Sequence, residues 1–527
     1  MGIPAYFSYI IKNHSRIICT IDTLQTIHNL YLDCNSIIYD ALYSLNETTQ
    51  DVELELIKMV CQKLHLYIQQ IKPINRVYIA FDGVAPVAKL NQQRTRRFRS
   101  SFINEVHDKL HNRVSNKWNS SAITPGTNFM DKLGKSIQNY FQNSKHFNVN
   151  EIIVSASDEV GEGEHKLFDY IRKNVDSHQN QNTIIYGLDA DLIMLSINHL
   201  PICSSIYLFR ETPEFIKQID KSLDANKLYM IDIPKLANEI ILTMNNYQEI
   251  DEEYKKNKIY DYIFLCFFLG NDFMPHIPAL NIRTNGIDII LDVYSKLFTG
   301  TDEILTNGKV IYWKNVKKMM KMLAEGEKEY LLTEYKIRDK LEKRNYPSST
   351  PEEKEMKFNS LPTKHRTIEK YIDPTSEGWE MRYYDKLFDV EWNDTRKKQI
   401  CHNYIEALEW TMKYYKYGCV DWRWKYNYNY APLLKDLYEC IPFFEESFFP
   451  EESITQPVSP MVQLSYVLPR NCLYMLPEKV REKVLEKYDH CYTFDVEFEW
   501  SFCKYFWECH MHLPEIEIKV LENIVKT

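Results

Sequence analysis

Acidic residues in the N-terminal part of the chain stand where folding could bring several carboxylates together. The full set is Asp33, Asp82, Glu162, Glu164, Asp189, Asp191 and Asp272. A partly buried group of carboxylates needs counter-charge to stay ionised, and oxygen-only ligand sets favour Mg²⁺ or Mn²⁺. Two such ions about 3.5–4 Å apart would stabilise the attacking and leaving oxygens of a phosphodiester displacement. The acids therefore suggest a metal-dependent phosphate enzyme.

Each acid also has an ordinary structural explanation. An aspartate that follows a strand usually caps a helix or makes a turn. What favours the metal site is the number of acids at the same kind of place, since Asp33, Asp82 and Asp189 all end or follow apolar runs. If residues 189–191 are extended, the two aspartates point to one face. Glu162 and Glu164 open an expected helix.

A basic stretch follows the turn after Asp82. Its residues Lys89, Gln93, Arg96 and Arg97 fall at i, i+4, i+7 and i+8, which is one face of a helix. Two guanidinium groups with an ammonium and an amide would make a compact phosphate pocket. A solvated charged helix face or a nuclear-import signal remains the alternative.

The elements that must position these residues alternate in type. Short apolar runs end at Leu32, Phe81, Val154 and Tyr186, with helical patterns between them. This alternation predicts an α/β fold with a parallel sheet and acids at the strand C-termini, where ligands sit in such sheets. We expect a nuclease domain over residues 1–300, a charged helical segment and flexible linker over 301–376, and a mostly helical, aromatic-rich second region over 377–527.

Composition narrows the class of protein. The 527 residues carry a net charge of −9, which excludes a binder that is basic throughout but not one with a local basic patch. The 12 cysteines form no C-x-x-C pair, which is typical of a reduced intracellular protein. We find no signal pattern and no membrane-spanning apolar run, so we expect a cytoplasmic protein without membrane contact, with a nuclear location left open.

With these residues in view, the sequence resembles the XRN family of 5′→3′ exoribonucleases. In the first region the resemblance rests on residues 1–7, Leu32–Asn35, Phe81–Arg94, Ile123–Thr127, Gly161–Lys166, Tyr186–Leu192 and Gly270–Phe273. In the second it rests on Gly378–Trp379, Tyr383–Tyr384, Trp410, Tyr414–Tyr415, Asp421–Trp424, Tyr430–Pro432, Val467–Pro469 and Leu476–Pro477. The similarity covers nearly the whole chain, and the large C-terminal modules of cytoplasmic members are missing from it.

The resemblance implies a role for each site residue. The seven acids would bind Mg²⁺, with Mn²⁺ as a substitute and two ions as the expected number. Lys89, Gln93, Arg96 and Arg97 would bind a 5′-monophosphate, and Pro86 would help to keep duplexes out. Family members stack the terminal base between a histidine and a tryptophan, but this chain has Tyr39 at the histidine position. The tryptophan would be Trp422 or Trp424, and core packing is the alternative role for each.

The sequence thus predicts a processive 5′→3′ exoribonuclease that degrades single-stranded 5′-monophosphorylated RNA to mononucleotides in mRNA decay. Two other functions stay open. One is a flap-type DNA nuclease, which would share the fold and the acids. The other is an inactive RNA-binding scaffold, against which the complete set of acids argues.

Overall fold

The computed structural model describes residue 3 and residues 5–45, 49–112, 118–187, 189–210, 224, 227–248, 251–388, 393–449, 455–493 and 496–526. These residues form a seven-stranded sheet in the order β1-β7-β6-β5-β2-β3-β4. The strands are β1 (Ile18–Thr20), β2 (Asn29–Asp33), β3 (Arg76–Ala80), β4 (Glu151–Ser155), β5 (Thr183–Tyr186), β6 (Ile206–Arg210) and β7 (Tyr229–Asp232). Strands β4, β3, β2, β5 and β6 run parallel, and β7 is antiparallel to both β6 and β1. The predicted parallel α/β sheet is confirmed, with an antiparallel pair at one edge.

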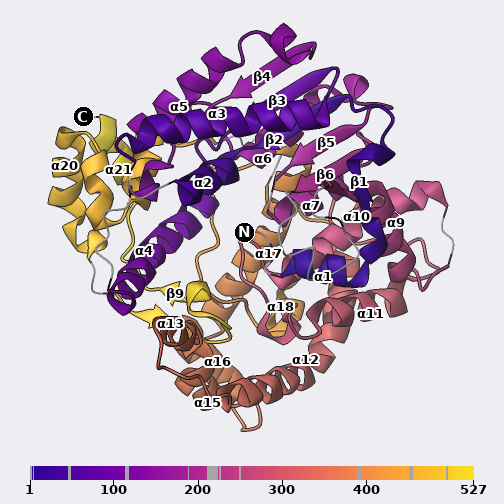
Figure 1. Cartoon of the computed structure of the whole chain (residues 1–527). Coiled ribbons are helices and arrows are strands. Elements are labelled where there is room, and N and C mark those ends of the chain that lie inside the picture. The colour runs from indigo at the N-terminus through magenta and orange to yellow at the C-terminus, as the bar shows by residue number, and fades with distance from the viewer. Residues whose placement is uncertain are drawn as a thin grey trace.

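Both faces of the sheet are buried, because successive residues of each central strand point into different clusters. In β2, Leu30 and Leu32 pack with α2 (Asn35–Ser44), α3 (Val52–Ile71) and α5 (Asn128–Tyr140). Tyr31 points the other way, toward α6 (Gly163–Lys173), α7 (Asp191–His199), α9 (Ile233–Met244) and α10 (Glu252–Cys266). This period of two is the reason why the strands read as nearly continuous apolar runs. Figure 1 shows the resulting layers of helix, sheet and helix.

The rest of the described chain is mainly helical. Its helices are α1 (Tyr6–Asn13), α4 (Val87–Leu110), α11 (Gly286–Phe298), α12 (Trp313–Glu342), α13 (Pro351–Asn359), α14 (Leu361–Lys364), α15 (Thr367–Ile372), α16 (Trp379–Phe388), α17 (Asp394–Tyr417), α18 (Leu434–Cys440), α19 (Pro460–Val467), α20 (Glu478–Tyr488) and α21 (Ile518–Lys526). Two short strands, β8 (Phe498–Glu499) and β9 (His510–Met511), pair antiparallel. Among the described residues, no helix is both long and apolar enough to cross a membrane.

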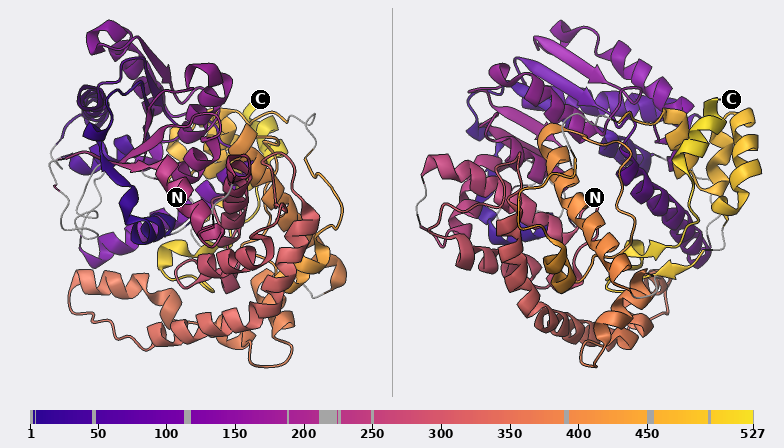
Figure 2. Two further views of the ribbon diagram at one scale, coloured as in Figure 1. Left: turned by 90° about the vertical axis from the view of Figure 1, so that its right-hand side faces the viewer. Right: turned by 180° about the vertical axis from the view of Figure 1, so that it is seen from behind.

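The hydrophobic clusters extend across the boundaries between the three expected parts of the chain. One cluster runs from Ile3 to Phe502 and joins the sheet to α12, α16 and α17. Another packs Leu90 and Phe98 of α4 against α19, α20 and α21. Figure 2 shows these C-terminal helices beside α4. Residues from both ends of the chain are therefore packed into common cores, and the exact domain limits stay a prediction.

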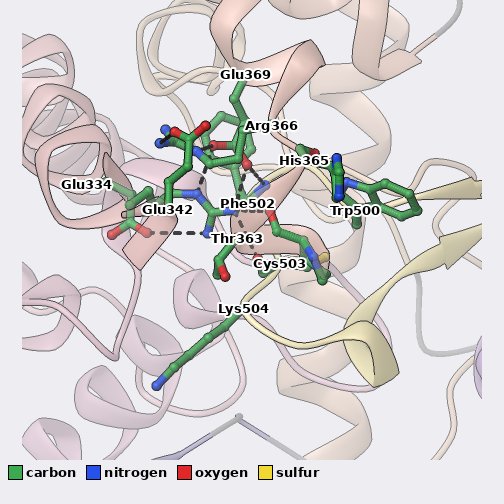
Figure 3. A network of polar contacts seen from close by, with 12 residues as sticks. Glu334, Glu342, Thr363, His365, Arg366, Glu369, Trp500, Phe502, Cys503 and Lys504 are labelled. Atoms are coloured by element: carbon green, nitrogen blue, oxygen red, sulfur yellow. Dashed lines mark hydrogen bonds and ion pairs between the residues drawn. The ribbon is translucent and has the colours of Figure 1, made fainter. Parts of the chain in front are cut away.

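Residues 351–372, within the segment expected to hold a flexible linker, form the short helices α13, α14 and α15, and buried charges hold them in place; the flexibility of the segment stays a prediction. Glu369 of α15 accepts two hydrogen bonds from Arg338 of α12, at 2.6 and 2.8 Å, and one from Arg366 at 2.5 Å. It also accepts the backbone N–H of Phe502 at 2.9 Å, which brings the C-terminal segment into the same network (Figure 3). Prolines and charges gave this stretch the composition of a linker, but Glu369 is buried and pairs both with Arg366 three residues before it and with Arg338 of α12.

We predict that Arg338→Ala strongly destabilises the fold. The Arg338 side chain is only 2% exposed, and its loss would leave Glu369 buried with one counter-charge fewer. Removing one partner of a buried ion pair typically costs roughly 3–5 kcal/mol. Thermal unfolding would measure the loss, with Lys340→Ala on the exposed face of the same helix as the matched control. Equal melting temperatures for the two variants would contradict the role given to the network.

Candidate active site

The acids meet at the carboxyl edge of the sheet because three of them end or follow neighbouring strands. Strand β2 lies between β3 and β5 and ends at Asp33, whose register partner on β3 is Ala80. Asp82 follows β3 and Asp189 follows β5. Parallel strands end at the same edge, so these three carboxylates are brought together by the topology alone.

The other four acids come from helix ends that face this edge. Glu162 immediately precedes α6 without a capping hydrogen bond from its side chain, and Glu164 lies in the first turn, so both open the helix as the sequence predicted. Asp191 is the first residue of α7, and Ala190 before it is already helical. The extended arrangement considered for residues 189–191 is therefore not present. Asp272 follows α10 through a turn in which the side chain of Asn271 accepts the N–H groups of Phe273 and Met274.

Glycine is required where α6 approaches Asp33. A Cβ atom at Gly163 would lie 2.4 Å from Oδ1 of Asp33, well inside any allowed contact. The N–H of Gly163 donates to Oδ1 of Asp82 at 2.7 Å. The start of α6 can therefore touch two of the acids at once only because residue 163 has no side chain.

Asp82 is also held by Asn35. The Asn35 amide donates to Oδ2 of Asp82 at 2.6 Å, and the Asp82 N–H donates back to Asn35 Oδ1 at 3.0 Å. Both carboxylate oxygens of Asp82 are thus fixed by the starts of α2 and α6. Next to it, Lys166 donates to the carbonyls of Phe81 and Ala156, both at 2.8 Å, and so ties the loops after β3 and β4 to α6.

The buried acids raise one another's pKa values. Burial, followed by the negative charges of Asp82, Asp189 and Glu162, raises the pKa of Asp33 well above its usual range. Burial and Asp191 do the same to the pKa of Glu164. Burial and Asp272 raise the pKa of Asp191 to about 7. The site therefore holds more negative charge than its own cations neutralise, which is the condition that favours a bound metal ion.

Two oxygens in the group have no hydrogen-bond partner. They are Oδ1 of Asp33 and Oε2 of Glu164, and both are buried. Unpaired buried carboxylate oxygens are costly, and a divalent cation is the ligand that would satisfy them. The donor set fits such an ion chemically. In the part of the chain that the structure describes, however, no three His, Cys, Asp or Glu side chains are already arranged to hold a metal.

Lys89 supplies the counter-charge in this arrangement. Its ammonium lies 2.5 Å from Oδ2 of Asp272 and 2.7 Å from Oε1 of Glu162. Burial acts to lower the pKa of Lys89, but these two acids hold it well above its usual range. Burial likewise acts to raise the pKa of Asp272, and Lys89 keeps it below its ordinary value. Lys89 thus belongs to the acidic group as much as to the basic face on which the sequence placed it.

The remaining residues of the basic face, Gln93, Arg96 and Arg97, follow Lys89 along α4. Gln93 is buried and its Oε1 is unpaired. Arg97 donates to the Ile123 carbonyl at 3.3 Å, and its Nε is buried and unpaired. Burial, together with the positive charge of Arg96, lowers the pKa of Arg97, whereas Tyr39 acts to raise it. No described carboxylate lies within ion-pair distance of Arg96 or Arg97, so this face has positive charge to offer an anion.

The two tryptophans have different surroundings. The carbonyl of Trp422 accepts the N–H of Val87 at 2.9 Å, which brings it next to Pro86 at the start of α4. The ring of Trp424 stacks on Trp410 with centroids 5.2 Å apart, and its Nε1 donates to Glu406 at 3.2 Å. Trp424 is therefore a packing residue of the second region, and Trp422 is the tryptophan beside the basic helix.

Tyr414 and Tyr415 contact the acids from the second region. Their hydroxyls donate to Oε2 of Glu162 and to Oδ1 of Asp191, both at 2.8 Å. The ring of Tyr414 also stacks on His165, with centroids 3.8 Å apart. Sequence reasoning noted both tyrosines only as part of a family pattern. Their adjacency near the end of a long helix gave no sign that each would face a different carboxylate.

Comparisons with known proteins agree with this architecture. Residues 1–212 match the family described as XRN 5′-3′ exonuclease N-terminus, and residues 253–371 and 364–527 match the Xrn1 helical domain. These matches extend over most of the sequence. The chain belongs to the XRN family.

Its relatives include curated exoribonucleases. The 5′-3′ exoribonuclease 1 of Saccharomyces cerevisiae is 27% identical over 94% of this chain and 41% of its own length. The 5′-3′ exoribonuclease 2 of Gallus gallus is 27% identical over 98% of this chain and 69% of its own length. This chain therefore spans less than half of the yeast relative. The solved catalytic core of Rad2 with a DNA substrate covers 64% of the chain at 14% identity, with a TM-score of 0.31, too low to support an argument.

We predict that Tyr415→Phe lowers nuclease activity by about 10- to 100-fold, the usual effect of losing a group that orients a metal ligand. Raising the Mg²⁺ or Mn²⁺ concentration should recover part of the loss, because Asp191 itself remains. Tyr417→Phe, an exposed position on the same helix, is the control. Titrating the metal in an RNA decay assay measures the effect. Identical metal dependence in wild type and Tyr415→Phe would rule out the orienting role.

Proposed function

We propose that this chain is a divalent-metal-dependent 5′→3′ exoribonuclease that degrades single-stranded, 5′-monophosphorylated RNA to mononucleotides in mRNA decay. The observation that carries the proposal is the position of the basic face of α4, which runs directly from the acidic group. Lys89, the first residue of that face, already contacts Glu162 and Asp272. A terminal phosphate held by the rest of the face would lie next to the acids.

The acids are proposed as the ligands of Mg²⁺ or Mn²⁺, most simply as a pair of ions. The chemistry that such ions supply when bound is stabilisation of the negative charge on the attacking and leaving oxygens. Lys89 would then be released from Glu162 and Asp272 and would become available to the phosphate. Asn35, Tyr414 and Tyr415 would hold their carboxylates in place.

The proposed phosphate pocket consists of Lys89, Gln93, Arg96 and Arg97. The unpaired Nε of Arg97 and the absence of a described carboxylate partner for either arginine support an anion there. A pocket of this size suits one phosphate, and a cap or triphosphate would add bulk and charge. Each cut would leave a new 5′-phosphate, so the same pocket would serve the next cycle and make the enzyme processive.

The terminal base is proposed to stack between Tyr39 and Trp422. Trp422 lies beside the start of α4, and Tyr39 is near enough to Arg97 to raise its pKa against the effect of burial. Tyrosine and tryptophan rings both stack on bases. Pro86, buried at the beginning of α4, would narrow the entrance to a single strand.

The decisive experiment is a decay assay with 5′-monophosphate, 5′-triphosphate, capped and 5′-hydroxyl RNAs, with and without EDTA. The proposal requires that monophosphorylated RNA is degraded fastest, from the 5′ end, and only with metal. Preferential cutting of branched DNA would instead favour a flap-type nuclease. RNA binding without cleavage in Mg²⁺ or Mn²⁺ would identify an inactive scaffold.

We predict that Asp189→Asn and Asp191→Asn each abolish cleavage and leave RNA binding largely intact. Each change removes one negative charge from the proposed metal site without altering the basic face. Turnover and filter binding measured on the same preparations separate the two effects. Asp131→Asn, an exposed acid on α5, should behave like wild type. Normal turnover in either site variant would remove that residue from the mechanism.

We further predict that Arg96→Ala or Arg97→Ala slows decay of monophosphorylated RNA and narrows its advantage over 5′-hydroxyl RNA. A charge-assisted hydrogen bond contributes roughly 1.5–3 kcal/mol, so two lost bonds would cost on the order of a hundredfold. The ratio of decay rates on the two RNAs is the measurement, and Lys109→Ala at the exposed end of α4 is the control. An equal loss on both substrates would mean that these arginines only contact the RNA backbone.

A further inference from the structure

Two cysteines from different helices face each other away from the acidic group. Cys401 lies on α17 and is fully buried, whereas Cys440 is the last residue of α18 and is partly exposed. The largest influence on the pKa of each thiol is the other thiol, which raises the pKa of Cys401 and lowers that of Cys440. Solvent can thus reach the thiol of Cys440, whereas the thiol of Cys401 is buried.

The register of the two helices independently puts these thiols together. One turn earlier on each helix, Lys397 of α17 forms an ion pair with Asp436 of α18, with Nζ 2.9 Å from Oδ1. Beyond α18 the chain continues along α17 in the same direction, since Ser447 and the N–H of Phe448 donate to Glu409. Residues at i and i+4 lie on the same face of a helix, so Cys401 and Cys440 stand one turn beyond Lys397 and Asp436 on the facing sides. Helices α17 and α18 pack against each other along this face.

The position of α18 is fixed from its other end. The N–H groups of Leu434 and Lys435 donate to the buried Glu327 of α12, at 2.6 and 3.2 Å. The Tyr384 hydroxyl donates to Asp436 at 2.8 Å. Contacts with α12 and α16 therefore hold α18 in place beside α17.

We propose that Cys401 and Cys440 form a reversible disulfide when the protein meets a hydroperoxide, and that this bond locks α17 to α18. Nothing in the proposed nuclease mechanism uses either residue, so the proposal stands apart from that function. The thiols would act as a modification site on the helix that carries Tyr414 and Tyr415 to the acids.

The chemistry follows from the different exposure of the two thiols. The Cys440 thiolate attacks one oxygen of hydrogen peroxide, the O–O bond breaks, and the other oxygen takes up the proton that Cys440 has lost and leaves as water, which gives a sulfenic acid. The Cys401 sulfur, having lost its proton, then attacks the Cys440 sulfur, and the S–O bond breaks with release of a second water. Two thiols are oxidised by two electrons and the peroxide is reduced to water. The neighbouring Cys401 thiol lowers the pKa of Cys440, which favours Cys440 as the first nucleophile.

The test is to oxidise the native full chain with hydrogen peroxide, block free thiols with N-ethylmaleimide, and map the peptides without reduction. A linked peptide containing residues 401 and 440 should dominate and should disappear after dithiothreitol. The oxidised protein should also melt at a higher temperature, because the cross-link restricts the unfolded chain. Cys19→Ser, which removes another partly buried cysteine, should change neither result.

Two variants separate the steps. Cys440→Ser should abolish the linked peptide and the rise in melting temperature. Cys401→Ser should stop the reaction at a Cys440 sulfenic acid that dimedone can label. The proposal is overturned if oxidised wild-type protein carries Cys440 as a singly modified thiol with Cys401 still free to react with maleimide. It is also overturned if the 401–440 link forms only after the protein has been unfolded.

Discussion

The burial of several carboxylates at one edge of the sheet is the constraint on which the rest of the structure depends. These groups raise one another's pKa values, and a folded chain can tolerate them only if other groups fix and partly neutralise them. Lys89 brings positive charge from α4, Asn35 and Gly163 donate to Asp82, and two tyrosines donate from α17. Each of these supports comes from a different element, so the acidic edge determines where α2, α4, α6 and α17 must lie.

Helix α17 is the clearest example of this dependence. It belongs to the second region of the sequence, yet its last turn contacts the acidic group at the edge of the sheet. The aromatic stack of Trp424, Trp410 and Tyr414 carries the packing of the second region up to His165 of α6. The two matched family regions are therefore parts of one site.

Much of the fold could be predicted from the sequence, because strand burial leaves a direct pattern. Leu30, Tyr31 and Leu32 form a continuous apolar run in β2, and Asp33 after them marks the end of that strand. The same reasoning located Asp82 and Asp189 and placed Glu162 at a helix start. The sequence did not reveal that Arg366 and Glu369 are buried and paired with each other. The contacts of Tyr414, Tyr415 and Lys89 were missed because each of their partners lies far away in sequence.

The two faces of α4 have different partners. Lys89 and Arg97 point toward the acids and the proposed phosphate pocket, while Leu90 and Phe98 pack under α19, α20 and α21. The C-terminal helices thus support α4, the helix that would bind the 5′ end of the RNA. The N-terminal and C-terminal parts of such a chain are not interchangeable modules. If the N-terminal part were exchanged between relatives, α4 would lose the C-terminal helices against which it packs. Recombination within the family should therefore preserve matched pairs of α4 and C-terminal helices, and changes in one should be accompanied by compensating changes in the other.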